Sequence, residues 1–323
     1  MRAVLILNPV SGISTVSTAQ MTPEEKEAVV LDSLRAHGVE VEVYHTELED
    51  TGQALAKRLA LQGAEVVIVA GGDGTVHSVA KGLIGMPVAL GIIPVGTMNN
   101  LAHSLNIPDT VEGACAVIAV GQQSLFDVGQ INGHLFLEVA GIGLEAALFT
   151  HAEDIKRPGL FSTIRGVVTG LVTLFTFRPP MMRVSFNKGQ RRPYHAIQVT
   201  ICNTPFYGAR LRAAPDARVD DGLLDVLVYR NFSKLEYFQH AISISQGRRV
   251  LQPKITTQRI TSLSITASHP VEIQADGVVI GHTPAQVSIM PGALRVLVPG
   301  VAATESGQAS CIAATSDQQG VRK

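Results

Sequence analysis

Short apolar runs alternate with helix-like segments through the first third of the chain. Four runs have the apolar or alternating pattern typical of β-strands: Ala3–Leu7, Val39–Tyr44, Glu65–Ala70 and Val88–Ile93. Three segments between them have helical character: Glu24–His37, Gln53–Gln62 and His77–Ile84. Because strand–helix–strand units of one sheet are parallel and right-handed, this order predicts an α/β domain with a parallel sheet. Ligands of such sheets bind at the carboxyl ends of the strands.

The pattern changes after Gly121, where strands follow one another with few helices. Phe126–Ile131 and His134–Val139 flank Asn132-Gly133, a dipeptide that favours a two-residue hairpin turn. Further strands are predicted at Arg183–Phe186, Tyr194–Cys202, Leu223–Tyr229, Arg259–Ala267, Val271–Ala275, Ala285–Met290 and Ala293–Val298, with helices at Leu160–Phe177 and Lys234–Ser245. The sequence therefore predicts a first domain over 1–124, a mostly antiparallel β domain over 125–300 and a disordered tail over 301–323.

Composition and charge exclude some functions. The chain has 323 residues, no Trp and 5% aromatic residues, which disfavours a base-stacking platform, and its net charge of −1 predicts no nucleic-acid partner. Residues 1–124 carry 6 Lys+Arg against 13 Asp+Glu, whereas residues 125–323 carry 20 against 14. The basic half suits an anionic surface such as a bilayer leaflet, although scattered, solvated arginines would give the same count.

Cysteine usage and the hydropathy pattern predict a cytoplasmic protein. The three cysteines lie far apart and form no zinc-binding pair, which is typical of a reducing compartment. The apolar run after Met1-Arg2 is too short for a signal peptide. Leu160–Phe177 is interrupted by Arg165 and has the spacing of a helix with one buried face, so we expect a core or interfacial helix rather than a membrane span.

The clearest chemical motif is Gly71-Gly72-Asp73-Gly74-Thr75, between a predicted strand and a predicted helix. Glycines let backbone N–H groups approach phosphate oxygens, and a helix N-terminus adds partial positive charge. A carboxylate here would repel phosphate unless a metal ion bridges them or it orients donors, so Asp73 indicates magnesium–nucleotide chemistry. The alternative is a tight turn in which Asp73 caps the helix.

Three further polar loops follow the other predicted parallel strands. Asn8 begins the turn cluster Asn8–Gly12, His45-Thr46 follows the second strand, and Thr97 and Asn99 follow the fourth. Loops at adjacent strand ends lie side by side, so these residues are expected to line one nucleotide cleft with Asp73.

In combination, Asn8–Gly12, Gly71–Thr75 and Gly96–Asn100 resemble the diacylglycerol kinase catalytic domain, the family of bacterial soluble lipid kinases, sphingosine kinases and ceramide kinases. The resemblance extends from residue 1 to about residue 300 and implies a phosphofructokinase/NAD kinase-like first domain. It also implies ATP and Mg²⁺ as cofactors. The nucleotide contacts that it implies come from Asn8, Thr46, Gly71, Gly72, Asp73, Gly74, Thr75 and Thr97.

Two Asp-Gly pairs of the second domain match the family as well. Asp221-Gly222 resembles the family's structural magnesium loop, in which the Asp221 carboxylate and the carbonyls of Arg218 and Leu223 would hold the ion. Asp276-Gly277 matches the family's catalytic Asp-Gly-Glu, which makes Asp276 the expected general base. For each pair the alternative is an ordinary turn, because Asp-Gly is a common turn dipeptide.

The sequence departs from the family pattern at several positions. Ile13 stands where a cation is usual, Asn100 where Asp is usual and Val278 where the Glu of Asp-Gly-Glu is usual. His77 and Ser78 stand where Asn and Glu are frequent in the family, so the resemblance does not extend the nucleotide contacts of this motif past Thr75. These changes predict a smaller polar network, consistent with a different lipid substrate or with weak activity.

The leading hypothesis is an ATP-dependent lipid kinase that phosphorylates a hydroxyl of diacylglycerol or a related long-chain lipid. It would meet its substrate at the membrane surface, as a peripheral protein of the inner face, and its oligomeric state is open, with a homodimer as one option. The alternatives are an NAD kinase-like enzyme, which shares Gly-Gly-Asp-Gly, and a catalytically weak nucleotide- or lipid-binding member of the family. Retention of both Asp73 and Asp276 argues against a non-catalytic module.

Overall fold

A computed structural model describes residues 2–8, 22–47, 50–149, 169–170, 172–207, 211–245 and 254–300. The chain divides into two compact units, Met1–Leu125 with Leu294–Lys323 and Phe126–Ala293. The predicted tail, the turn after Asn8 and most of the predicted helix Leu160–Phe177 lie outside the described residues.

Unit 1 is built on a parallel sheet, as the alternating pattern predicts. Its strands are β1 (Ala3–Leu7), β2 (Val41–His45), β3 (Val66–Gly71) and β4 (Ala89–Pro94), joined by the end of β17 (Ala285–Val298) in the order β17-β4-β3-β1-β2. Leu5 lies opposite Val43 on one side and Ile68 on the other. β1, β3 and β4 are buried along their whole length because helices cover both faces of the sheet.

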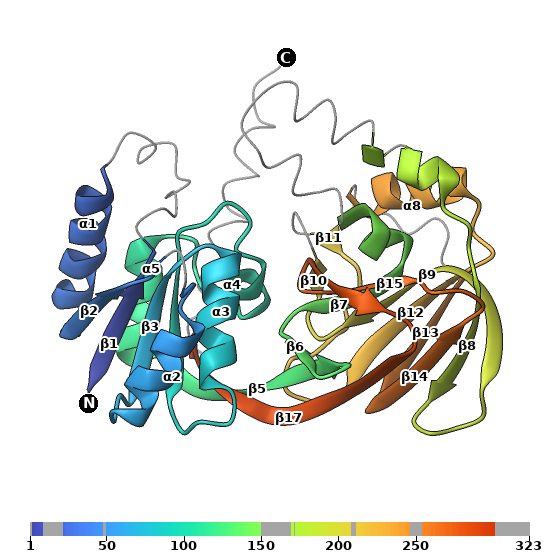
Figure 1. Cartoon of the computed structure of the whole chain (residues 1–323). Helices are drawn as coiled ribbons and strands as arrows, with labels where there is room; N and C mark the ends of the chain where they lie inside the picture. Colours follow the sequence, from blue (N-terminus) through green and yellow to red (C-terminus); the bar gives the residue numbers. More distant parts are fainter. Residues whose placement is uncertain are drawn as a thin grey trace, which may run out of the picture. The chain divides into compact units, whose positions relative to one another are not determined.

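Four of the five helices described in unit 1 form two packed pairs. The five helices are α1 (Pro23–Ala36), α2 (Gln53–Leu61), α3 (Asp73–Leu83), the short α4 (Asn100–Ser104) and α5 (Val111–Val120). In Figure 1, α2 and α3 lie together in front of the sheet, and α1 packs with α5 behind it. α1 begins with a capping box between Thr22 and Glu25. α3 begins at Asp73, earlier than the predicted start at His77, so part of the glycine motif is helical.

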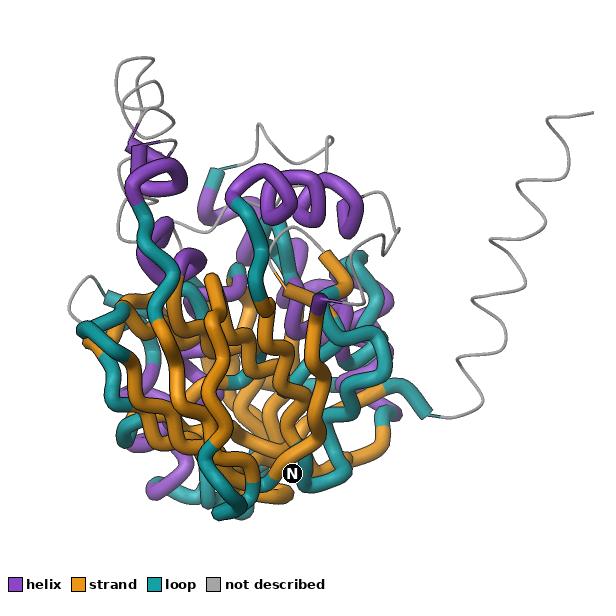
Figure 2. Tube along the Cα trace, turned by 90° about the vertical axis from the view of Figure 1, so that its right-hand side faces the viewer, coloured by secondary structure: helices purple, strands orange, loops and turns teal. Residues whose placement is uncertain are grey.

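Unit 2 is mostly antiparallel, as predicted. Its strands are β5 (Gln122–Ile131, which begins in unit 1), β6 (His134–Phe136), β7 (Val139–Gly143), β8 (Met181–Phe186), β9 (Arg192–Cys202), β10 (Phe206–Tyr207), β11 (Leu211–Arg212), β12 (Leu224–Arg230), β13 (Ile255–Ile260), β14 (Ser262–Ala267), β15 (Glu272–Ala275), β16 (Val278–His282) and the first part of β17. Helix α8 spans Lys234–Ser245, and shorter helical stretches are described at 144–149 and 172–176. Figure 2, in which the right-hand side of Figure 1 faces the viewer, shows strands of this unit (orange) running side by side.

The long strand β9 connects the strands of unit 2 around its core. Its first residues pair with β8, and its last residues pair with β7 on one side and β12 on the other. The apolar side chains of these strands form the core, which includes the buried residues Phe136, Val199 and Ile273. Asn132 and Gly133 both have positive φ, so the predicted Asn-Gly hairpin turn is confirmed.

Strand β17 belongs to both units. Its first part pairs antiparallel with β14, and its last part pairs parallel with β4, with Arg295 opposite Ala89. The sequence analysis includes residues 294–300 in the second domain because it groups the strands after Gly121 as one mostly antiparallel unit. In the structure these residues complete the parallel sheet of unit 1. Within the described part of the chain, no helix combines the length and the apolar character that crossing a membrane requires.

The packing of α3 against α2 provides a test of the fold. A Cβ at Gly82 would collide with the backbone oxygen of Gln53 and lie 3.1 Å from Cβ of Ala56. We expect Gly82→Ala to lower the melting temperature, because overpacking costs about 1–3 kcal/mol, more than the gain of about 1 kcal/mol in helix propensity. Gly74→Ala is the matched control on the same helix, since its methyl group enters open space. Equal melting of both variants would contradict the close packing.

Candidate functional site

The strand ends of unit 1 bring several predicted residues together. Asn8, directly after β1, donates from Nδ2 to Oγ1 of Thr75 at 2.9 Å, and its backbone N–H donates to Ala70 O at 3.3 Å. Thr75 is buried in the first turn of α3. The amide of Asn8 therefore joins the loop after β1 to the glycine motif after β3, as expected for neighbouring loops of a parallel sheet.

Two glycines let the loops after β3 and β4 approach each other closely. A Cβ at Gly72 would lie 3.3 Å from Cα of Gly96, and a Cβ at Gly96 would lie 2.5 Å from Cα of Gly72. Any side chain at Gly96 would push the loops apart. Gly72 is also the N-cap of α3 and offers no side-chain cap to its first N–H groups. The backbone thus forms a cradle at a helix N-terminus, an arrangement that suits a phosphate group.

Asp73 joins the same two loops through its side chain. It is the first residue of α3, not its N-cap, and its Oδ2 accepts a 2.9 Å hydrogen bond from the backbone N–H of Asn99. Asn99 has a φ of 51°, and its side chain bonds both N–H and C=O of Gly96 at 3.0 Å. The capping role considered from the sequence is therefore replaced by an orienting one. The carboxylate of Asp73 thus fixes the backbone of Asn99, and the side chain of Asn99 fixes Gly96 in the second loop.

The other predicted nucleotide residues lie at the same edge of the sheet. Thr46 follows β2, is half-buried, and donates its backbone N–H to Leu7 O at 3.0 Å. Thr97 is exposed beside Gly96. The contact of each with a nucleotide stays a prediction. Asn100, a departure from the family pattern, is 7% exposed and begins α4, so its amide occupies a buried position.

In unit 2, Asp276 lies in the hairpin turn between β15 and β16. Asp276 and Gly277 have φ of 47° and 81°, the left-handed values of a tight two-residue turn. The carboxylate also accepts hydrogen bonds from backbone N–H groups that precede or begin β7, with Oδ1 2.9 Å from Glu138 N and Oδ2 3.0 Å from Leu137 N. A turn residue needs no such contacts. The carboxylate of Asp276 is therefore held in one orientation, as a reacting group would have to be.

A buried polar network, which the sequence analysis missed, supports this turn. Gly277 N donates to Gln274 Oε1 at 2.8 Å, and Gln274 Nε2 donates to Glu145 Oε1 at 2.8 Å. Oε2 of Glu145 accepts hydrogen bonds from Gln198 Nε2 and, at 3.3 Å, from Thr200 Oγ1. These four side chains are each at most 6% exposed. The one sign of this network in the sequence is that its polar residues interrupt otherwise apolar runs.

The network reaches α8 through Tyr237, whose hydroxyl donates to Gln198 Oε1. Burial, followed by the negative charge of Glu145, raises the pKa of Tyr237 well above its ordinary value. The same two causes raise the pKa of the buried Cys202 thiol. Both groups therefore stay neutral near pH 7, and Tyr237 acts as a hydrogen-bond donor.

The predicted magnesium loop is anchored by side chains on both sides. Asp221 Oδ1 accepts from Leu223 N at 3.0 Å, and Oδ2 is paired with the guanidinium of Arg259. The buried Asp127 accepts from Gly222 N at 2.6 Å. Burial raises the pKa of nearby Asp225. The oxygen donors of the loop suit a hard cation, although Arg259 would compete with it for Asp221.

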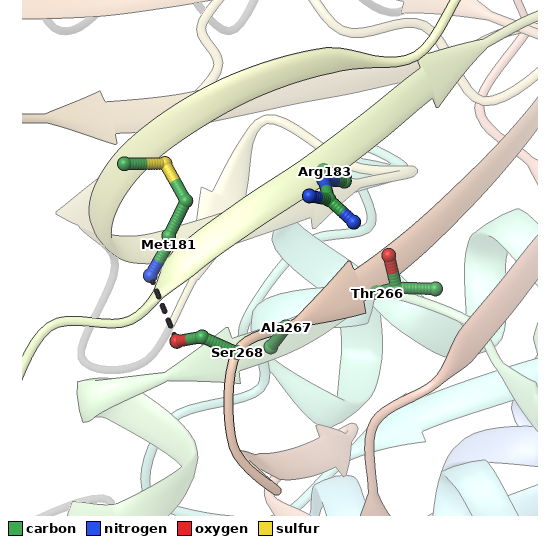
Figure 3. A pocket seen from close by; sticks show the side chains of 5 residues that line it. All are labelled: Met181, Arg183, Thr266, Ala267 and Ser268. Carbon is green, nitrogen blue, oxygen red and sulfur yellow. Dashed lines mark hydrogen bonds between the residues drawn. The ribbon is translucent and has the colours of Figure 1, made fainter.

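A shallow pocket elsewhere in unit 2 contains none of the predicted site residues. Figure 3 shows its lining on β8, on β14 and just beyond β14: Met181, Arg183, Thr266, Ala267 and Ser268. Ser268 Oγ accepts a 3.2 Å hydrogen bond from Met181 N, so this polar atom is used within the protein. We assign no function to the pocket.

Comparisons with known proteins agree with this organisation. Residues 2–131 match the family model of the diacylglycerol kinase catalytic domain, and residues 138–298 match the YegS C-terminal NAD kinase beta sandwich-like domain. The two models together cover most of the chain, which therefore carries a diacylglycerol kinase catalytic domain followed by a YegS-type C-terminal domain and is a lipid kinase.

Named relatives match along most of their length. A diacylglycerol kinase of Bacillus subtilis (strain 168) is 27% identical over 303 residues, which cover 92% of this chain and 96% of that protein. A diacylglycerol kinase of Staphylococcus aureus (strain MRSA252) is 27% identical over 305 residues, with 92% of each chain covered. The crystal structure of a putative diacylglycerol kinase from Bacillus anthracis str. Sterne has a TM-score of 0.75 at 24% identity and covers 93% of this chain and 98% of that chain, which confirms the fold.

The Glu145 network gives a prediction about stability. In Glu145→Gln, one acceptor oxygen becomes an NH₂ group that must face the NH₂ group of Gln198 or Gln274. We expect a loss of about 1–3 kcal/mol in the free energy of unfolding, the usual cost of an unsatisfied buried group, measured by denaturant titration. Glu272→Gln, the same change at a half-buried position of β15, is the control. If both variants unfold at the same denaturant concentration as the wild type, Glu145 does not accept these hydrogen bonds.

Proposed function

We propose that this lipid kinase transfers the γ-phosphate of ATP to a hydroxyl group of diacylglycerol or a related long-chain lipid. The observation that carries the nucleotide half is the Gly72–Gly96 backbone cradle at the start of α3. The lipid half rests on relatives that are named diacylglycerol kinase. The experiment that tests the whole is incubation with γ-labelled Mg-ATP and a panel of lipids in mixed micelles. If the labelled phosphate were transferred to NAD instead of to a lipid, the result would favour an NAD kinase-like enzyme.

The residues of unit 1 would bind and orient the nucleotide. ATP supplies the transferable phosphoryl group and a good leaving group. In the proposal, backbone N–H groups of Gly72–Thr75 contact its phosphates, and Asp73 keeps Asn99 and hence the Gly96 loop in place. Asn8 fixes Thr75, and Thr46 and Thr97 add polar contacts at the rim. Because phosphoryl transfer depends mainly on positioning, rigid contacts between these loops would contribute directly to the rate.

Asp276 is proposed as the group that accepts the proton of the attacking lipid hydroxyl. Its support is the orientation of its carboxylate by the N–H groups of residues 137–139 and the bracing of its turn by Gln274. Mg²⁺ is proposed to accompany the nucleotide, and a second ion is proposed at Asp221 with the carbonyls of Arg218 and Leu223.

Asp276→Asn separates the turn role from the catalytic role. Asn tolerates the left-handed backbone of this position, so the turn is kept. We expect kcat to fall at least about 100-fold, the usual effect of losing a positioned base, with little change in ATP affinity. The NH₂ group of Asn would face a backbone N–H, so we also expect a stability loss of about 1–3 kcal/mol, and assays should be run well below the melting temperature.

The exposed Asp32→Asn on α1 is the matched control and should behave like the wild type in both assays. Wild-type kcat in Asp276→Asn would make Asp276 a turn residue only, and the base would have to be sought elsewhere.

Competition between Mg²⁺ and Arg259 gives a second prediction. In the absence of nucleotide, Mg²⁺ should raise the melting temperature of the wild type, because an ion bound only by the folded state stabilises it by mass action. The rise should be larger in Arg259→Gln, which frees the Asp221 carboxylate, and absent in Asp221→Asn. An equal rise in all three proteins would show that the ion binds elsewhere.

A further inference from the structure

Helix α8 presents an apolar face outward. Leu235, Phe238 and Ile242 have the three- and four-residue spacing that places side chains on one side of a helix. They are 66%, 50% and 43% exposed, respectively. The opposite side packs inward, with His240 buried and Tyr237 against the core. α8 is therefore apolar on the side where a helix of a globular protein is usually polar.

The apolar face continues onto a neighbouring segment. The short helical stretch at 172–176 lies beside α8 in Figure 1, and Lys234 Nζ donates to the carbonyl oxygen of Phe175. Phe175 is 67% exposed and Val172 is 53% exposed. Among the described residues of unit 2, seven large apolar side chains are exposed, and five of them belong to this surface: Val172, Phe175, Leu235, Phe238 and Ile242. We call these five residues the α8 surface.

We propose that the α8 surface docks on an anionic lipid bilayer and inserts its apolar side chains among the headgroups. The proposal rests on the proposed function, because acyl chains hold the proposed substrate in a bilayer. Exposed apolar clusters of this kind mark interaction sites. An amphipathic helix with aromatic and aliphatic side chains on one face and Lys at its end is typical of interfacial binding.

Charge favours a bilayer over another apolar partner. Residues 126–293 carry 17 Lys+Arg against 12 Asp+Glu, a net charge of +5. Lys234 begins α8, and Arg178, which is exposed, follows the 172–176 stretch. The exposed Arg178 can extend to the headgroups while its methylene stem covers apolar surface. Lys234, whose Nζ bonds to Phe175 O, adds positive charge near the surface, and salt weakens the attraction of both charges to an anionic leaflet.

The inner face of the same helix connects it with the proposed catalytic turn. Tyr237 bonds Gln198, Gln198 bonds Glu145, and Glu145 bonds Gln274, which bonds the N–H of Gly277. Every member of this chain lies in unit 2, so the helix and the turn that carries Asp276 form one hydrogen-bonded assembly. This placement is why we assign the surface to the bilayer that contains the lipid substrate.

Vesicle flotation without ATP tests the proposal directly. The wild type should float with vesicles of equal parts phosphatidylcholine and phosphatidylglycerol, and less with phosphatidylcholine alone or at high salt. In the double variant Leu235→Gln/Phe238→Gln, partitioning should fall about 100-fold, on the order of tenfold for each side chain that no longer inserts. The control is Leu61→Gln on α2, a 73% exposed leucine of unit 1, which should bind like the wild type. Wild-type flotation of the double variant, or no flotation of the wild type, would overturn the proposal.

A fluorescent reporter locates the docking surface. The chain contains no Trp, so Phe238→Trp introduces a single one. Its emission should shift to the blue when the anionic vesicles are added, because the indole enters the interface, whereas Leu61→Trp should show no shift. No shift at Phe238→Trp under conditions that float the protein would place the contact elsewhere. A second copy of the chain would be identified as the occupant, and the bilayer rejected, by two results together. The emission would shift with protein concentration in the absence of vesicles, and the protein would form a dimer that the double variant abolishes.

Turnover separates this proposal from the proposed function. A short-chain diacylglycerol dispersed in detergent needs no docking, so the double variant should keep the wild-type kcat on it and lose turnover on long-chain diacylglycerol in vesicles through a raised KM. A wild type that floats with vesicles but phosphorylates neither lipid would reject the proposed function and leave the docking supported. Equal loss on both substrates in the double variant would reject a docking role.

Discussion

The close approach of Gly72 to Gly96 is the contact on which the candidate nucleotide site depends. Parallel strands end at the same edge of a sheet, but ordinary side chains keep their following loops apart. Here the backbones of Gly72 and Gly96 approach closely, and the hydrogen bonds of Asp73 and Asn99 connect the loops after β3 and β4. The N–H groups at the start of α3 thereby keep a fixed position, and a phosphate group could be bound without rearrangement of the protein.

Unit 2 uses a different means to fix its polar groups. Glu145, Asp276 and Asp127 are carboxylates whose hydrogen bonds described above come from amide, hydroxyl and backbone N–H groups rather than from a cation. Taking a carboxylate out of water is costly unless hydrogen bonds replace its hydration. The donors to Glu145 come from two strands, β9 and β15, whereas those to Asp276 and Asp127 described above are backbone N–H groups of loops or of the first residue of β7. Burial first, and then the negative charge of Glu145, raise the pKa of both Tyr237 and Cys202 above their ordinary values, so both groups are kept in their neutral forms.

The sequence predicts the parallel sheet and the antiparallel domain because their apolar periodicities are strong and local. It also predicts which loops of unit 1 meet, since topology alone places Asn8 near Thr75. It does not predict the contacts of Asp276 with residues 137–139, because these depend on the register of β15 against β7. The hydrogen bonds of buried Glu145 with Gln198 and Gln274 cannot be predicted from the sequence either, since they join one helical and two strand segments that lie far apart in the chain. The return of β17 to unit 1 escapes prediction because a parallel edge strand and an antiparallel strand have similar local composition.

The two faces of α8 bring these observations together. Its inner face contributes Tyr237 to a network that reaches the Asp276 turn, and its outer face is apolar where solvent would favour polar side chains. A soluble monomer gains no stability from Leu235 or Phe238 in water, and both residues add to the risk of aggregation. Their presence is physically reasonable if the helix spends part of the catalytic cycle against an apolar phase.

The inner face of α8 would then have a second role. Tyr237 and Gln198 connect α8 to the strands that flank the Asp276 turn. A force that a bilayer applied to the helix would therefore act on the same hydrogen-bond network that supports this turn. If α8 docks as proposed, its attachment to this network would keep the bilayer and the proposed base at a constant distance.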